Sequence, residues 1–206
     1  MRRTLLALSM LSALPATAAA QDGAYGRLDG DLTLEASVGG GATHEAEAWS
    51  GAALVEARMR YLDVAGLMLG GEWRPEGASR VVLMADVRPL FLARFLTNAS
   101  FGDRFWDVLV DSIGVDLGVA FAPLDQGIGA ALAVGFGLDV PLVFFDGYAG
   151  MSLRLFGRHV AALASDRFGP DGALNDWVAG GLLVFRGQVS TGIPGWAPRR
   201  YELPDR

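Results

Sequence analysis

The sequence predicts an all-β fold, an eight-stranded antiparallel up-and-down transmembrane β-barrel with a short helical insert around residues 101–111. Three observations carry this prediction. Apolar residues alternate with small or charged ones from residue 28 almost to the C-terminus, as a strand between two unlike environments requires. The first 20 residues have the pattern of an export leader, and beyond them no apolar run reaches the ~18 residues of a membrane helix. Any membrane crossing must therefore be made by strands.

The first 20 residues have the features of a cleaved signal peptide. Arg2 and Arg3 precede an apolar stretch at 5–14, and Ala18-Ala19-Ala20 resembles a cleavage site before Gln21. A membrane anchor would need ~20 apolar residues, about twice this run. We therefore expect a barrel domain at 21–186 and a Gly/Pro-rich C-terminal tail at 187–206, exported across the inner membrane of a Gram-negative cell.

The composition excludes several classes of function. Without the leader, 15 arginines face 23 acidic residues, a net charge of about −8, and no basic cluster offers a surface for nucleic acid. All 17 basic residues are arginine and none is lysine. The absence of cysteine excludes disulfides and thiolate zinc sites, and no cofactor or metal site is expected.

Eight segments alternate strongly enough to be predicted as strands. In 113–121, for example, Ile113, Val115 and Leu117 alternate with glycine and aspartate. Gly39-Gly40-Gly41 is interpreted as a turn, and longer loops are expected at 39–50 and 158–175. The predicted strands are 28–38, 51–61, 67–74, 81–88, 113–121, 128–140, 148–156 and 176–186.

The composition of the two faces predicts their direction. In a soluble, lipocalin-like barrel the glycines of the less apolar face would meet water, where strands usually carry Thr, Lys or Glu. In a narrow membrane barrel the same face fills the lumen, and its charges must pair because the interior is poor in water. The predicted lumen charge network consists of Asp31, Glu35, Glu56, Arg58, Arg60, Glu72, Arg74, Asp86, Arg88, Asp116, Asp139 and Arg154.

Aromatic residues gather near the predicted strand ends, as in the interfacial girdles of membrane barrels. The predicted membrane-interface aromatics are Trp49, Tyr61, Trp73, Phe91, Phe121, Phe144, Tyr148, Trp177 and Phe185.

Residues 89–112 break the two-residue alternation. Asp103, Asp107 and Asp111 recur every four residues, which predicts a helix at 101–111 on the periplasmic side. This helix could lie on the membrane surface or cap the barrel mouth. Three aspartates on one face would be repelled by anionic headgroups, which favours the cap.

The chain resembles small eight-stranded outer-membrane barrels, the class of the OmpA-type transmembrane domain and OmpX-like proteins. The resemblance covers about residues 28–186 and includes the spacing Gly180-x-x-Leu183-x-Phe185, similar to the terminal strand signal of that class. It implies an outer-membrane location, contact with outer-membrane lipids, a monomeric state and a non-catalytic role as an envelope scaffold. Surface loops could bind a cell-surface or periplasmic protein partner.

The sequence leaves two other functions open. A lipid A-modifying or lipid-binding barrel would use the rim around His159, Ser165 and Asp166. The chain is similar to lipid A deacylases in size and export, but Ala161 stands where their nucleophilic serine follows the histidine. The other alternative is a soluble periplasmic barrel that holds an apolar ligand.

Overall fold

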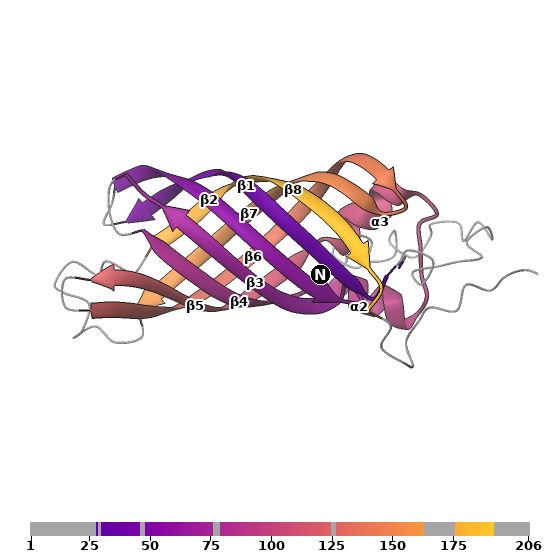
Figure 1. Cartoon of the computed structure of the whole chain (residues 1–206), viewed down its shortest axis with the longest axis horizontal. Helices are drawn as coiled ribbons and strands as arrows, with labels where there is room; N and C mark the ends of the chain where they lie inside the picture. The colour runs from indigo at the N-terminus through magenta and orange to yellow at the C-terminus, as the bar shows by residue number, and fades with distance from the viewer. Residues whose placement is uncertain are drawn as a thin grey trace, which may run out of the picture.

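The computed structural model describes residues 28, 30–45, 48–75, 79–124, 127–162 and 176–191, and within them the predicted barrel is confirmed. Eight strands close into one barrel, each antiparallel to its neighbours in chain order, and β1 pairs with β8 (Figure 1). The strands are β1 (Leu32–Glu45), β2 (Ala48–Tyr61), β3 (Ala65–Trp73), β4 (Arg80–Val87), β5 (Gly114–Leu124), β6 (Gly127–Asp146), β7 (Ala149–Ala162) and β8 (Asp176–Val189).

The connections define two different ends of the barrel. At one end lie the start of β1, the end of β8, the β2–β3 turn at 62–64 and both helices; we call this the helical end (Figure 1). At the opposite end, the far end, β1 turns into β2, β3 into β4, β5 into β6 and β7 into β8.

The structure corrects the prediction for the first strand. Gly39-Gly40-Gly41 is not a turn but the middle of β1, paired with Leu182, Gly181 and Gly180 of β8. A Cβ on Gly39 would overlap the carbonyl oxygen of Gly181, so the two backbones approach too closely here for any larger residue. Glycine lets a strand bend sharply where a small barrel closes.

Other boundaries also move outward, because strand pairing continues past the apolar alternation. The loop expected at 39–50 is almost entirely strand, and of the loop expected at 158–175, residues 158–162 belong to β7 while 163–175 lie outside the described residues. β8 continues to Val189, so the start of the tail at 187 was placed three residues too early.

Two helices replace the single one expected between β4 and β5. Helix α3 (Arg104–Asp111) falls within the predicted range, and its N-cap Asp103 accepts hydrogen bonds from the amides of Phe105 and Trp106. Helix α2 (Pro89–Leu96) was not predicted. Over the described ranges, neither helix has the length and hydropathy needed to cross a membrane.

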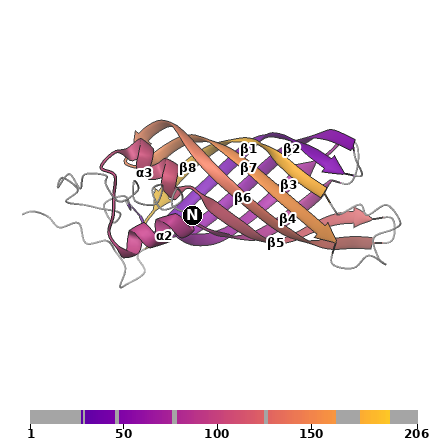
Figure 2. The same cartoon turned by 180° about the vertical axis from the view of Figure 1, so that it is seen from behind.

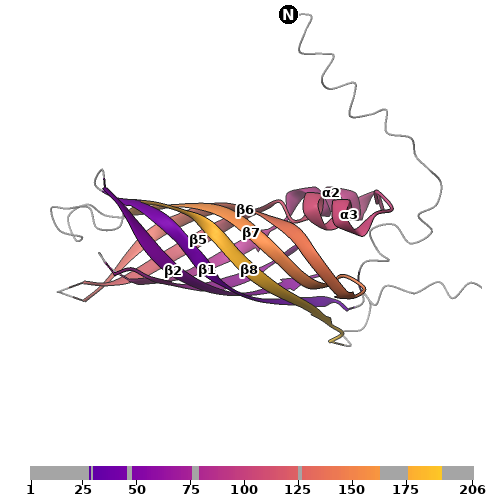
Figure 3. The same cartoon turned by 90° about the horizontal axis from the view of Figure 1, so that it is seen from above.

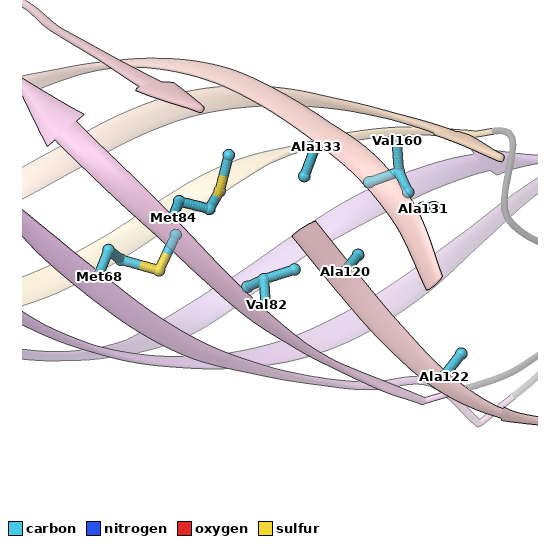
Figure 4. Close-up of a cluster of buried hydrophobic side chains, with 8 residues drawn as sticks. All are labelled: Met68, Val82, Met84, Ala120, Ala122, Ala131, Ala133 and Val160. Carbon is cyan, nitrogen blue, oxygen red and sulfur yellow. The ribbon is translucent and has the colours of Figure 1, made fainter. Parts of the chain in front are cut away.

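The barrel interior contains apolar clusters as well as charges. One cluster lies on the inner side of β3–β7 and combines methionine and valine with alanine (Figure 4). Its members are Met68, Val82, Met84, Ala120, Ala122, Ala131, Ala133 and Val160. The prediction of a lumen filled only with small and charged side chains is therefore incomplete.

Candidate functional site

The outer wall and the interior have opposite chemistry. Along β2, Val55 and Met59 are exposed, while Glu56, Arg58 and Arg60, at the alternate positions, are buried. The same alternation in β5 leaves Leu117 more than half exposed. The direction of the apolar face is thus the reverse of that in a soluble barrel, whose oily side chains would point inward.

Arginines of β2 form the centre of a buried ion-pair network. Arg60 is fully buried, and its two terminal nitrogens donate to both carboxylate oxygens of Glu35 at 2.6 Å each, while its Nε donates to Asp86 at 2.6 Å. Arg58 makes a similar two-bond contact with Asp116, at 2.8 and 3.0 Å. Such paired bonds need the planar guanidinium, which lysine lacks.

The network continues without a break from the helical end to the far end. It begins at Asp63 in the β2–β3 turn, which pairs with Arg88, and passes through Glu35 and Arg60. It ends at Asp176 at the start of β8. The later links are Asp86–Arg58, Arg58–Glu56, Glu56–Arg158, Arg158–Glu72, Glu72–Arg80 and Arg80–Asp176.

The network is electrically balanced within the described part of the chain. Its eight arginines, at 58, 60, 74, 80, 88, 154, 158 and 186, face eight carboxylates, at 35, 56, 63, 72, 86, 116, 139 and 176. Because both signs are present in equal number and in contact, the desolvation cost of each charge is offset by a partner.

Eleven of the twelve predicted lumen residues belong to this network, and the twelfth, Asp31, lies elsewhere. Asp31 precedes β1 and accepts hydrogen bonds from the backbone and side chain of Thr191, tying the two chain ends of the barrel together. Sequence reasoning missed five members: Asp63, Arg80, Arg158, Asp176 and Arg186. Arg158 has the correct parity in β7 and was missed only because that strand was ended at residue 156.

The predicted interface aromatics divide between the two ends of the wall, with one exception. Trp49, Trp73 and Trp177 are exposed near the far end, as is Phe121. At the helical end, Tyr61 and Phe185 are exposed, while Phe144 contacts Tyr148 with ring centroids 6.5 Å apart. Phe91 is a correction: it is fully buried in α2, packed with Leu28, Leu62 and Phe95.

Both histidines stand in an outward-facing row with two tryptophans at the far end. In strand register, Trp49 pairs with His44, His44 with Trp177, and Trp177 with His159. The rings of His159 and Trp177 are stacked at 4.5 Å, and those of His44 and Trp49 lie 4.7 Å apart. Loops were expected at 39–50 and 158–175, but His44 lies in β1 and His159 in β7. The two histidines are separated by Trp177.

The remaining residues of the proposed enzymatic site, Ser165 and Asp166, lie outside the described residues. His159 itself has its Nδ1 3.2 Å from the carbonyl oxygen of Asp176. Within the ranges that the structure describes, no group of three or more His, Asp or Glu side chains is arranged to hold a metal ion.

Comparison with known proteins shows likeness only at the level of the fold. No protein-family model matches the chain, and no curated protein matches it. The structure is similar to the outer membrane protein OprG from Pseudomonas aeruginosa, with a TM-score of 0.45 and 10% identity over 78% of this chain and 97% of OprG. It is also similar to Neisserial surface protein A, with a TM-score of 0.40 and 9% identity over 77% of this chain and 97% of that protein.

Proposed function

We propose that this protein is a non-catalytic β-barrel of the outer membrane, an envelope scaffold whose far-end connections face the cell surface. The observation that carries the proposal is the orientation of the wall, with exposed Leu, Val and Met outside and a balanced ion-pair network inside. An apolar outer surface around a polar interior is the arrangement that contact with lipid acyl chains favours. The helical end, where both chain ends of the barrel lie, then faces the periplasm.

Insertion of the purified full chain into phospholipid vesicles tests this proposal. The barrel is expected to become protease-resistant only when lipid is present, because without lipid its apolar outer wall would be exposed to water. Protease resistance of the same degree without lipid or detergent would contradict it.

The packed interior argues against a general pore. Arg60, Arg88 and Arg158 are each almost completely buried. They pair with carboxylates of strands that are not their neighbours, namely Asp86 of β4, Asp139 of β6 and Glu72 of β3. We expect no porin-like conductance when the protein is reconstituted in a planar bilayer, and a large stable conductance would show that the interior is open.

A lipid A-modifying activity is the second candidate, favoured by the position of His159 on the outer wall near the far end. Its ring is occupied by the stacking contact with Trp177, which fits an interfacial anchor better than a general base. The His159→Ala variant separates the two: an unchanged lipid A mass spectrum supports the scaffold, whereas loss of a modification that the wild-type chain adds would establish the enzyme.

A further inference from the structure

The two helices form a hairpin with one buried apolar face and one exposed apolar face. Phe91, Phe95 and Val108 are buried, and the first two pack on Leu62 of the β2–β3 turn. The opposite surface is unusually apolar for a connection: Leu96 is 72% exposed and Trp106 is 55% exposed. The further exposed apolar side chains are Leu90, Leu92, Phe101 and Phe105.

Three charges of the hairpin pair with one another instead of facing that outer surface. Arg94 of α2 pairs with Asp107 and, at 2.7 Å, with Asp111 of α3, and its guanidinium lies 4.2 Å from the ring centroid of Phe101. Both aspartates are buried. Two of the three aspartates that weighed against contact with anionic headgroups are therefore buried and paired with one arginine inside the hairpin, and the outer face keeps its apolar residues.

The hairpin continues the barrel wall on one side of the helical end. Figure 3 shows both helices along one side of the helical end, and Figure 2 shows α3 near the end of β6 with α2 below it. Arg104 at the start of α3 donates to the carbonyl oxygen of Gly147, and Ser112 after its end bonds with Asp139 of β6. Helix α3 thus lies beside the last part of β6.

The outer surface of β6 remains apolar as far as the part of the strand that lies beside α3. Leu142, Val143 and Phe145 are all about half exposed or more, and they belong to the part of β6 that α3 accompanies. The exposed face of the hairpin is therefore continuous with the wall that the proposed function places against lipid. A face continuous with the bilayer-facing surface and rich in exposed apolar side chains is suited to the headgroup–acyl boundary of a membrane.

We propose that the outer face of the α2–α3 hairpin lies in the periplasmic leaflet of the membrane, as an interfacial anchor that extends the lipid-facing wall. The inference rests on the proposed function, since it requires a barrel that is itself in a bilayer. It assigns a lipid surface as the partner of Leu96 and Trp106, and not a second copy of the chain or a soluble protein.

Tryptophan fluorescence in vesicles tests this directly. Replacing Trp49, Trp73, Trp177 and Trp196 by Phe leaves Trp106 as the single probe in the full-length chain. The matched control replaces all five tryptophans and adds Phe136→Trp, on the outer face of the middle of β6. Both are folded into phosphatidylcholine vesicles whose acyl chains carry bromine near the headgroup end, with iodide as the quencher in water.

We expect the bromolipid to quench Trp106 at least as strongly as it quenches the deeper probe of the Phe136→Trp control, and iodide to have little effect on either. Quenching of the control alone, with Trp106 open to iodide, would overturn the anchor and leave the barrel proposal intact. Blue-shifted Trp106 emission that neither quencher affects would place the face against protein and would also overturn it. Failure of the bromolipid to quench even the control would overturn the barrel proposal, and the anchor with it.

Discussion

At the scale of single residues, parity along the strands decided most of what the sequence could predict. Arg58, Arg60 and Asp86 share the inward phase with the small residues, so their burial followed from the alternation alone. Their partners did not, because the pairs join positions far apart in the chain: Arg158 contacts Glu72 and Glu56 across the barrel. The spacing of residues in the sequence does not predict which inward-facing side chains contact each other.

The contacts of Arg60 predict a large effect of its removal. Arg60→Met leaves Glu35 and Asp86 buried without their closest cation, and breaking a buried pair in this way costs about 3–5 kcal/mol. Urea titration of the vesicle-folded protein measures the free energy of unfolding. The double variant Glu35→Gln/Arg60→Met is expected to recover part of the loss, and a single variant as stable as the wild type would contradict the network.

The outer wall predicts the opposite sensitivity to charge. Leu117→Arg places a cation on the exposed apolar face of β5 and should destabilise the barrel in lipid by ~2–4 kcal/mol. Trp49→Arg, close to the far end, is the matched control and should cost at most ~1 kcal/mol, because the penalty falls toward the interface. Equal effects at the two positions in urea titrations would show that the wall does not span a bilayer.

At the scale of elements, the strands themselves were predictable but their ends and one helix were not. Helix α2 packs one face on the barrel and exposes the other, and both faces of its sequence Pro89-Leu-Phe-Leu-Ala-Arg-Phe-Leu96 are mostly apolar. It therefore lacks the periodicity that marked α3. The glycine run in β1 carried a turn signal that strand pairing with β8 overrides.

The glycines of β1 predict a position-specific cost for adding one methyl group. Gly39→Ala forces the new Cβ against the backbone of Gly181, which cannot rotate away as a side chain can, so we expect a loss of about 1–3 kcal/mol in the same titration. Gly51→Ala in β2 is the control, since no atom lies within 4 Å of its added Cβ. If both variants unfold at the wild-type midpoint, β1 and β8 are not in close approach at this point.

The helical hairpin should lose order in acid. Burial alone would raise the pKa of Asp107, but hydrogen bonds from the Phe101 amide, Arg94 and Ser100 outweigh it and hold the pKa below its ordinary value of 3.8. The stabilisation is therefore complete above about pH 5 and declines as the pH falls through the ordinary and then the lowered pKa.

Hydrogen exchange of the α2 and α3 amides in vesicles measures this decline. Protection should be constant from pH 7 to about pH 5, after correction for the intrinsic exchange rate, and should fall below about pH 4. Asp107→Asn is the control: it should show reduced protection already at pH 7. Undiminished protection of the wild-type hairpin well below pH 3 would mean that the carboxylate contributes nothing to its order.

At the scale of the whole molecule, the closed barrel and its orientation followed from the alternation, whereas the mixed content of the interior did not. The apolar cluster around Met68 and Met84 occupies inward positions that the sequence assigned to small and charged residues. The cluster was missed because a few apolar residues on the inner face reduce the difference in apolar content between the two faces but do not reverse it.

Cell fractionation combined with gel migration of unboiled samples tests whether the apolar face meets lipid while the charges pair inside. The protein is expected in the outer-membrane fraction, and its unboiled form is expected to migrate at a position different from the boiled form. Recovery in the soluble periplasm, with the same migration before and after boiling, would contradict it.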